Sequence, residues 1–221
     1  MDETATSVPQ PTSEGDSRQP HAANRPLLWI MGGVLLALVG FVGFVVRLMA
    51  DTPRPEIVLA GFATNLERRT PAQRYNAKRA ADALNGVIIP PGATFSFNKT
   101  VKGWTWEQGY VKAPVSYDGE LVPAFGGGVC QTSTTLYNVA LMAGLPIVER
   151  HHHVFAPHYI TPGRDAAVAQ YDIDLRFKNP YPWAVRLKTS VHANLLEISA
   201  LGVEKPSSEV RILTDVLSQE N

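Results

Sequence analysis

The segment GGGVCQTSTTLYN, from Gly126 to Asn138, constrains the fold of this chain more than any other stretch. Its three glycines permit backbone conformations that other residues avoid, and they let a neighbouring segment or ligand approach closely. The residues from Gln131 to Leu141 include few helix breakers and predict a helix. Cys130, the only cysteine in 221 residues, is therefore expected where a loop becomes a helix.

The position of Cys130 favours a nucleophilic role. The unpaired N–H groups at a helix start carry roughly half a positive charge, which stabilises a thiolate over a thiol. A lone cysteine is also common as a small buried hydrophobe, so the sequence leaves a structural role open. Because a single cysteine cannot form an intrachain disulfide, disulfide pairing says nothing about the redox compartment.

A long apolar segment lies near the start of the chain. Residues 27–46 contain no charged side chain and stand between Arg25 and Arg47. At about 1.5 Å per residue, a helix of this length crosses the roughly 30 Å hydrocarbon core of a bilayer. The segment is long for a core helix, and Leu48 does not fit the small-residue pattern of a signal-peptide cleavage site. We therefore predict a retained single-pass membrane anchor, with the C-terminal domain outside the cytoplasm.

The rest of the sequence predicts flanking segments around one globular domain. Residues 1–25 have the composition of a disordered tail, and two prolines make residues 51–56 an extended linker. We place the domain at residues 57–201 and a mostly polar C-terminal tail at residues 202–221.

Helical and β-prone patterns within this domain set its fold class. Helical patterns occupy residues 71–85 and 131–143 and end near Gly86 and Gly144. Short β-prone runs separated by Gly, Pro and Asp favour antiparallel strands. We therefore predict an α+β fold with a mainly antiparallel sheet and two principal helices, preceded by the single transmembrane helix. The β-prone runs are residues 87–89, 94–97, 110–116, 121–124, 172–178, 183–191 and 195–201.

The segment ERHHHVFAPHY supplies candidate bases for the thiol. In an extended segment His151 and His153 would share one face, whereas His152 would point away. Imidazole is also a common zinc ligand, but a closed structural site needs four ligands and three adjacent side chains cannot converge without distortion. We therefore expect no metal and no cofactor. A solvated run of histidines remains the alternative to a catalytic base.

A third group that orients the imidazole would complete the usual arrangement of nucleophile, base and orienting residue. The segment PGRDA supplies Asp165 for this role, although an aspartate after Pro-Gly is also common in turns. Arg164 beside it can bind a substrate carboxylate through its planar guanidinium, or form a surface ion pair. Candidate substrate contacts besides the catalytic residues are Gly128, Gln131, Ser133, His151 and Arg164.

The charge balance excludes one class of partner. Lys and Arg together number 20, as do Asp and Glu, so the formal net charge is zero. The sequence also contains no basic stripe interleaved with aromatic residues. We therefore expect no nucleic-acid partner.

Four segments of the chain resemble the VanW family of bacterial cell-envelope proteins. They occur in the family's order and spacing, and the resemblance covers about residues 57–201. The segments are PPGATFSFN (Pro90–Asn98), the long central block from Gly109 to His153, PGRDA (Pro162–Ala166) and DLRFKN (Asp174–Asn179).

The resemblance implies a function in the cell wall. The family is associated with peptidoglycan, and some members are L,D-transpeptidases that use the cysteine of the GGGxCQ segment. For this chain it implies that Cys130 forms a thioester with a stem peptide outside the cytoplasm. It also implies that the last histidine of an E-R-x-x-H pattern, His153, is the base. Other members imply the alternative of a non-catalytic module that binds the cell wall or assists glycopeptide resistance.

Overall fold

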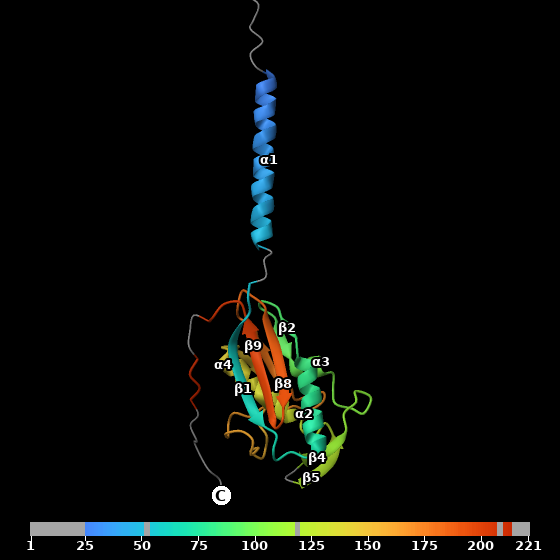
Figure 1. The fold of residues 1–221 in the computed structure, drawn as a ribbon. Coiled ribbons are helices and arrows are strands. Elements are labelled where there is room, and N and C mark those ends of the chain that lie inside the picture. The colour runs from blue at the N-terminus through green and yellow to red at the C-terminus, as the bar shows by residue number, and fades with distance from the viewer. Residues whose placement is uncertain (1–24, 51–53, 118–119, 207–209, 214–221) are drawn as a thin grey trace, which may run out of the picture. The chain divides into compact units, whose positions relative to one another are not determined.

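The computed structural model describes residues 25–50, 54–117, 120–206 and 210–213 (Figure 1). The chain divides into two compact units, Met1–Pro53 and Arg54–Asn221, which we describe separately. The predicted disordered tail, apart from its last residue, lies outside the described residues. The same is true of much of the linker and most of the predicted C-terminal tail.

The first unit contains helix α1 (Arg25–Ala50). Its side chains are described from Ile30 to Val45. Among the described residues, no helix is both long enough and apolar enough to cross a membrane. On this finding the predicted transmembrane helix at residues 27–46 is wrong, and so is that part of the predicted fold class.

The second unit is an α+β domain with antiparallel sheets, as the sequence predicts. Its helices are α2 (Pro71–Leu84), the short α3 (Phe97–Val101) and α4 (Val129–Met142). Helices α2 and α4 are the two principal helices that were expected, and α3 is an additional short one; with α1, the described part of the chain contains four helices. The strands are β1 (Ile57–Asn65), β2 (Ile88–Ile89), β3 (Thr94–Ser96), β4 (Lys112–Tyr117), β5 (Glu120–Phe125), β6 (Ile147–Glu149), β7 (Arg176–Lys178), β8 (Val185–His192) and β9 (Leu195–Gly202).

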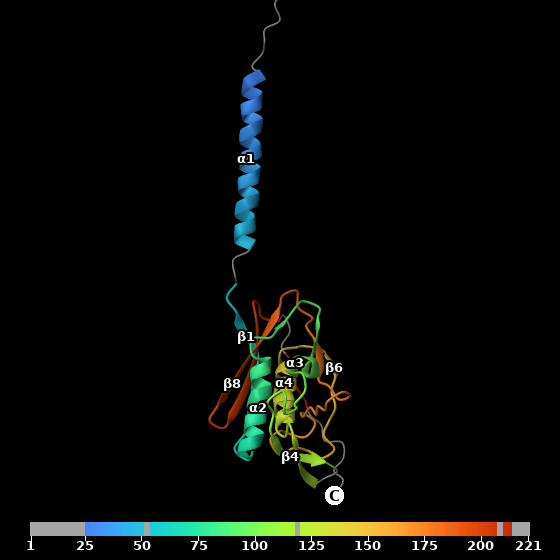
Figure 2. The same ribbon diagram turned by 90° about the vertical axis from the view of Figure 1, so that its right-hand side faces the viewer.

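In the described residues of this unit the strands form three sheets, whereas the sequence predicted one main sheet. The largest has the strand order β1-β9-β8-β2, the second β3-β7-β6, and the third is the hairpin β4-β5. Every strand pair within the described residues is antiparallel. Figure 2 shows α2 and α4 between the largest sheet and strand β6 of the second sheet. Helix α4 is therefore enclosed by other elements, so most of its side chains are buried.

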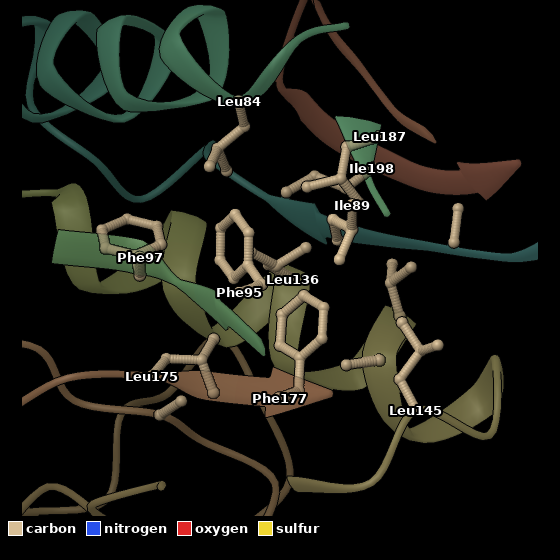
Figure 3. Close-up of a cluster of buried hydrophobic side chains, with 14 of the residues drawn as sticks. Leu84, Ile89, Phe95, Phe97, Leu136, Leu145, Leu175, Phe177, Leu187 and Ile198 are labelled. Carbon is tan, nitrogen blue, oxygen red and sulfur yellow. The ribbon is translucent and has the colours of Figure 1, made fainter. Parts of the chain in front are cut away.

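The hydrophobic core fills the space between these layers (Figure 3). Phe95 of β3 stacks on Phe177 of β7 with ring centroids 4.7 Å apart. Leu136 of α4, Leu187 of β8 and Ile198 of β9 complete the contact between the sheets. Each such side chain contributes about 1.5–3 kcal/mol when it is fully buried, so this cluster holds the helices firmly against the sheets.

The polar side of α4 is buried as completely as its apolar side. Thr132 donates to the backbone carbonyl of Ala77 at 3.0 Å, and Thr135 shares a 2.8 Å hydrogen bond with Thr64 of β1. A buried polar group without a partner costs about 1–3 kcal/mol, so these bonds restrict how α4 can rotate or slide. The buried polar residues of α4 are Gln131, Thr132, Ser133, Thr134, Thr135 and Asn138.

Candidate active site

The three-glycine loop places Cys130 at the start of α4, as predicted. Gly128 is the residue before the helix and has φ 109°, in the left-handed region that favours glycine. A Cβ on Gly128 would collide with the backbone carbonyl of Gln73, and one on Gly127 would lie 2.6 Å from the carbonyl oxygen of Pro114. The loop can therefore press against α2 and β4 only because these positions carry no side chain.

Helix α2 fixes this loop through a buried amide. Asn76 is fully buried and donates from Nδ2 to the carbonyls of Val111, at 2.9 Å, and Gly127, at 3.0 Å. Its Oδ1 accepts the backbone N–H of Val111 at 3.0 Å. Gln73, one turn earlier, donates to the Pro114 carbonyl at 2.9 Å. Sequence reasoning missed both residues. The pattern that could have revealed them is the presence of two uncharged polar side chains, Gln73 and Asn76, within the predicted helix at residues 71–85.

The structure brings His153 and Asp165 together. The carboxylate Oδ2 of Asp165 lies 2.6 Å from both the backbone nitrogen and the ring Nδ1 of His153, and both nitrogens donate to it. The imidazole of His153 and the side chain of Cys130 line the same cavity, and Cys130 raises the pKa of His153. Because Asp165 occupies Nδ1, Nε2 is the ring nitrogen left to serve the sulfur. The three side chains are therefore grouped as a nucleophile, a base and an orienting residue.

The electrostatics of the pair keep the imidazole protonated. Burial lowers the pKa of His153, but hydrogen bonds with Asp165 and Cys130 outweigh it and raise this pKa to about 9. Burial of Asp165 would raise its pKa, but the hydrogen bonds from His153 and the charge of Arg150 lower it to about 2. At neutral pH the imidazole of His153 is therefore protonated.

Arg150 positions Asp165 and was missed in the sequence. Its Nη2 donates to the Asp165 carboxylate at 2.8 Å, and its Nε donates to the backbone carbonyl of the same residue at 2.7 Å. The guanidinium also lies over the ring of Tyr137, 5.4 Å from the centroid. The sequence could have pointed to Arg150, because it belongs to the same E-R-x-x-H pattern as His153.

Cys130 and His153 line a cavity of about 780 Å³. Cys130 is half-buried, and its Sγ donates to the carbonyl of Val168 at 3.4 Å. Gly128 and Gln131 also line the cavity. Asn98 supports the part of the lining at Ala169, because its Nδ2 donates to the carbonyls of Ala169 and Ile173 at 2.8 and 3.1 Å. The apolar part of the lining includes Trp104, Val115, Leu121, Phe125 and Phe155.

Gln131 is held by the protein itself. Its Oε1 accepts from Arg69 Nε at 2.7 Å, and its Nε2 donates to Thr64 Oγ1 at 3.1 Å and to the Asn65 carbonyl at 2.9 Å. Its backbone N–H donates to the carbonyl of Gly128 at 3.1 Å. The side chain is 1% exposed, so its contacts fix β1 and Arg69 around the start of α4.

Three predicted substrate contacts are not brought to the cavity. Ser133 is fully buried and donates to the Ala166 carbonyl at 2.7 Å. Arg164 donates to the Asn138 side chain at 2.8 Å, and His151 is exposed with its Nε2 3.1 Å from the Glu149 carboxylate. None of the three lines the cavity, so their predicted contacts with substrate stay predictions.

The histidine-rich segment was also considered as a zinc site. His151 bonds to Glu149, and the Nδ1 of His152 bonds to the carbonyl of His153 at 2.9 Å. Within the part of the chain that the structure describes, no group of three or more His, Cys, Asp or Glu side chains is arranged to hold a metal ion.

Comparison with known proteins gives a family match and two relatives. Residues 72–201, more than half of the chain, match the family model described as "VanW like protein". The chain is 33% identical over 153 residues to the Bacillus subtilis (strain 168) protein named "Uncharacterized protein YoaR". The aligned region covers 69% of this chain and 50% of that protein. Over 111 residues it is 36% identical to "Vancomycin B-type resistance protein VanW" of Enterococcus faecalis (strain ATCC 700802 / V583). This aligned region covers 48% of this chain and 40% of that protein. The chain therefore spans half or less of the length of these relatives, and no solved structure matches it.

Proposed function

The chain belongs to the VanW-like family, and on that premise we propose that it is a cysteine-dependent L,D-transpeptidase that acts on peptidoglycan stem peptides outside the cytoplasm. The observation that carries this proposal is the grouping of three side chains: His153 bonds to Asp165, and His153 and Cys130 line one cavity of about 780 Å³. A cavity of this size lies within the usual range for small-molecule sites. The name of the Enterococcus faecalis relative, a vancomycin B-type resistance protein, supports a place in the cell envelope.

The first half-reaction uses the thiolate as nucleophile. Cys130 attacks the carbonyl carbon of the third residue of a donor stem, and a C–S bond forms. The imidazolium of His153 donates its proton to the nitrogen of the fourth residue, which leaves as a free amine when the C–N bond breaks. The product is a thioester on Cys130 and a neutral His153.

The second half-reaction resolves the thioester. An amine of a second stem attacks the thioester carbonyl, and neutral His153 accepts the proton that this amine loses. The C–S bond breaks, a new amide joins the two stems, and the thiolate and imidazolium are restored. Asp165 keeps the imidazole in one orientation through both steps, because it binds the Nδ1 that faces away from the sulfur.

The start of α4 supplies a donor for the oxyanion that forms during each attack. The N–H groups of Val129 and Gln131 donate to the loop carbonyls of Gly126, at 2.9 Å, and Gly128, at 3.1 Å. Among the described residues no such partner is found for the N–H of Cys130, so it is the donor of this turn that can bind the oxyanion. The loss of one such donor costs about 3–4 kcal/mol of transition-state stabilisation in enzymes that use it.

Intact-mass spectrometry tests the proposal. The full chain, incubated with a disaccharide tetrapeptide, is expected to form a covalent adduct on Cys130 and then release cross-linked or trimmed product. In Cys130→Ser both adduct and product should disappear. The thermal midpoint should stay nearly unchanged, because Ser is close to Cys in size and the hydrogen bond of the sulfur to the Val168 carbonyl is long, at 3.4 Å.

Two results would contradict the acyl-transfer proposal. In the first, wild-type protein binds the muropeptide without forming an adduct or product, which leaves a non-catalytic wall-binding module. In the second, Cys130→Ser unfolds the domain, which assigns the sulfur a structural role.

A further inference from the structure

The cavity beside Cys130 is lined by cationic side chains without acidic ones. Arg68, Arg69 and His153 contribute positive charge to its wall, and among the described lining residues there is no Asp or Glu. His158 also lines the cavity, and burial together with the charges of Arg69 and Arg68 lowers its pKa. Such a cavity favours an anionic ligand.

The backbone of Arg69 is fixed before any ligand binds. Its N–H donates to the carbonyl of Leu66 at 2.9 Å, and its own carbonyl accepts from Arg74 Nε at 3.0 Å. The next residue, Thr70, caps α2: its Oγ1 accepts the N–H of Gln73 at 3.2 Å, and its N–H donates to the Gln73 side chain at 3.1 Å. Arg69 is therefore attached to the rigid first turn of a helix.

The side chain of Arg69 is held in the cavity wall from two sides. Its Nε donates to Gln131 Oε1 at 2.7 Å, and its guanidinium carbon lies 4.6 Å from the ring centroid of Tyr159. Within the described residues, no carboxylate forms an ion pair with it. A half-buried guanidinium without a counter-ion is costly, and its Nη groups are the ones left to pair with an anion.

Arg69 lies near the nucleophile. Its Nε bonds to Gln131, which directly follows Cys130 in the chain, and Arg69 and Cys130 line the same cavity. Burial lowers the pKa of Arg69, and the nearby Tyr159 and Cys130 oppose this effect. In a peptide, the carboxylate of a C-terminal residue lies about 3–4 Å from the carbonyl carbon of the residue before it.

We propose that Arg69 is the specificity residue of this site, and that its guanidinium binds the C-terminal carboxylate of the donor stem. The inference rests on the proposed function, because that function defines which peptide bond of the donor stem is broken. It restricts the donor to peptides that end one residue after the attacked carbonyl, so a stem that continues further is a poor donor. Arg is suited to this role because its planar guanidinium binds a carboxylate through two parallel hydrogen bonds.

A binding experiment tests the inference without the chemical step. The full chain carrying Cys130→Ser is titrated calorimetrically with the disaccharide tetrapeptide and with the same compound as its C-terminal amide. We expect the amide to bind about 10- to 100-fold more weakly, because it lacks the charge that pairs with the guanidinium. Adding Arg69→Gln should weaken binding of the acid by a similar factor and abolish the preference, while Arg69→Lys should keep part of it.

Lys188→Gln is the matched control, since Lys188 is exposed on β8 and lies outside the cavity lining, and it should keep the full preference. Equal affinity for acid and amide would overturn the inference. So would a preference that survives Arg69→Gln. If Arg69→Gln fails to fold, the comparison of acid and amide on the Cys130→Ser chain decides alone.

The two proposals fail in different ways. An Arg69-dependent preference for the acid, on a protein that never forms an adduct, supports the carboxylate site and removes the transpeptidase. Adducts that form equally fast from acid and amide support acyl transfer and overturn the role of Arg69.

Discussion

Among the four clustered histidines, His153 is the one that bonds to Asp165 and also lines the cavity beside Cys130. The sequence narrows the choice to one face of an extended segment, which His151 and His153 would share. What separates them is the carboxylate of Asp165, which accepts both the backbone N–H and the ring N–H of His153. This contact joins residues 12 positions apart across a loop, so local pattern could suggest the partner but not identify it.

The raised pKa of His153 predicts the pH dependence of acylation. Since this pKa is about 9 and above the ordinary value of 6.5, the imidazolium persists as pH rises through neutrality and is lost only above about pH 9. The leaving amine needs that proton, so the rate of adduct formation should decline above about pH 9. In Asp165→Asn the carboxylate that raises the pKa is gone, and the decline should move to lower pH, towards 6.5. Intact-mass measurement of the adduct across a pH series checks the alkaline decline in the wild type and in Asp165→Asn.

Asp82→Asn is the matched carboxylate-to-amide control, because Asp82 is exposed and, among the described residues, forms an ion pair only with Lys78 on the surface of α2. It should leave the profile of the wild-type protein unchanged. An alkaline decline at the same pH in wild type and Asp165→Asn would show that Asp165 does not govern the proton on His153.

The glycine loop and α4 are both fixed to the elements around them. The loop is pressed against α2 and β4, and the buried polar residues of α4 bond to β1 and to the segment around Ala166. Cys130 sits where the two meet. The position of the nucleophile is therefore set by backbone packing on one side and by buried hydrogen bonds on the other.

Gly128→Ala is expected to disrupt this junction. The backbone there has φ 109°, which strains any L-residue, and the added Cβ would collide with the Gln73 carbonyl. We expect a loss of about 3 kcal/mol or more in the free energy of unfolding, together with a changed rate of Cys130 alkylation in the native protein. Urea unfolding and iodoacetamide labelling measure the two effects.

Gly86→Ala separates strain from collision. Gly86 also has positive φ, at 80°, but a Cβ there would meet no atom within 4 Å. It should cost only about 1–2 kcal/mol and leave the alkylation rate unchanged. Equal losses in the two variants would mean that the loop yields to the new side chain and does not fix Cys130.

The sequence predicts elements well where the pattern is local and poorly where pairing is distant. Helices α2 and α4 are found within a few residues, and so are the hairpin strands β4 and β5. Strand β1 is missed, because IVLAGFATN lacks a clear alternation and is a strand through its pairing with β9, more than 130 residues away. The predicted run at residues 172–178 is a strand only over Arg176–Lys178.

The same limit applies to the site. Cys130, His153 and Asp165 belong to conspicuous segments and were all named from the sequence. Arg69, Asn76 and Arg150 were missed, although each holds part of the site. Arg69 and Asn76 act on residues 62 and 51 positions away, and no local pattern reveals such a contact.

At the scale of the whole chain, the site and the core both belong to the unit Arg54–Asn221. The family match begins only at residue 72, yet β1 lies before it and contacts the site. Gln131, next to the nucleophile, donates to Thr64 Oγ1 and to the Asn65 carbonyl at the end of this strand. The functional domain is therefore predicted to include β1, in agreement with the start at residue 57 proposed from the sequence.

Two truncations test where the domain begins. A chain that starts at Arg54 keeps every strand of the largest sheet, so its thermal midpoint and Cys130 adduct should match those of the full chain. A chain that starts at Leu66 loses β1, which exposes one edge of β9, removes Leu59 and Phe62 from the core boundary and leaves the buried Gln131 amide without two acceptors. We expect it to unfold or to lose more than about 10 °C in thermal midpoint, because burial and hydrogen bonds worth several kcal/mol disappear together. Scanning calorimetry and adduct formation compare the two chains, and equal behaviour would show that the strand is dispensable and that the domain begins nearer residue 72.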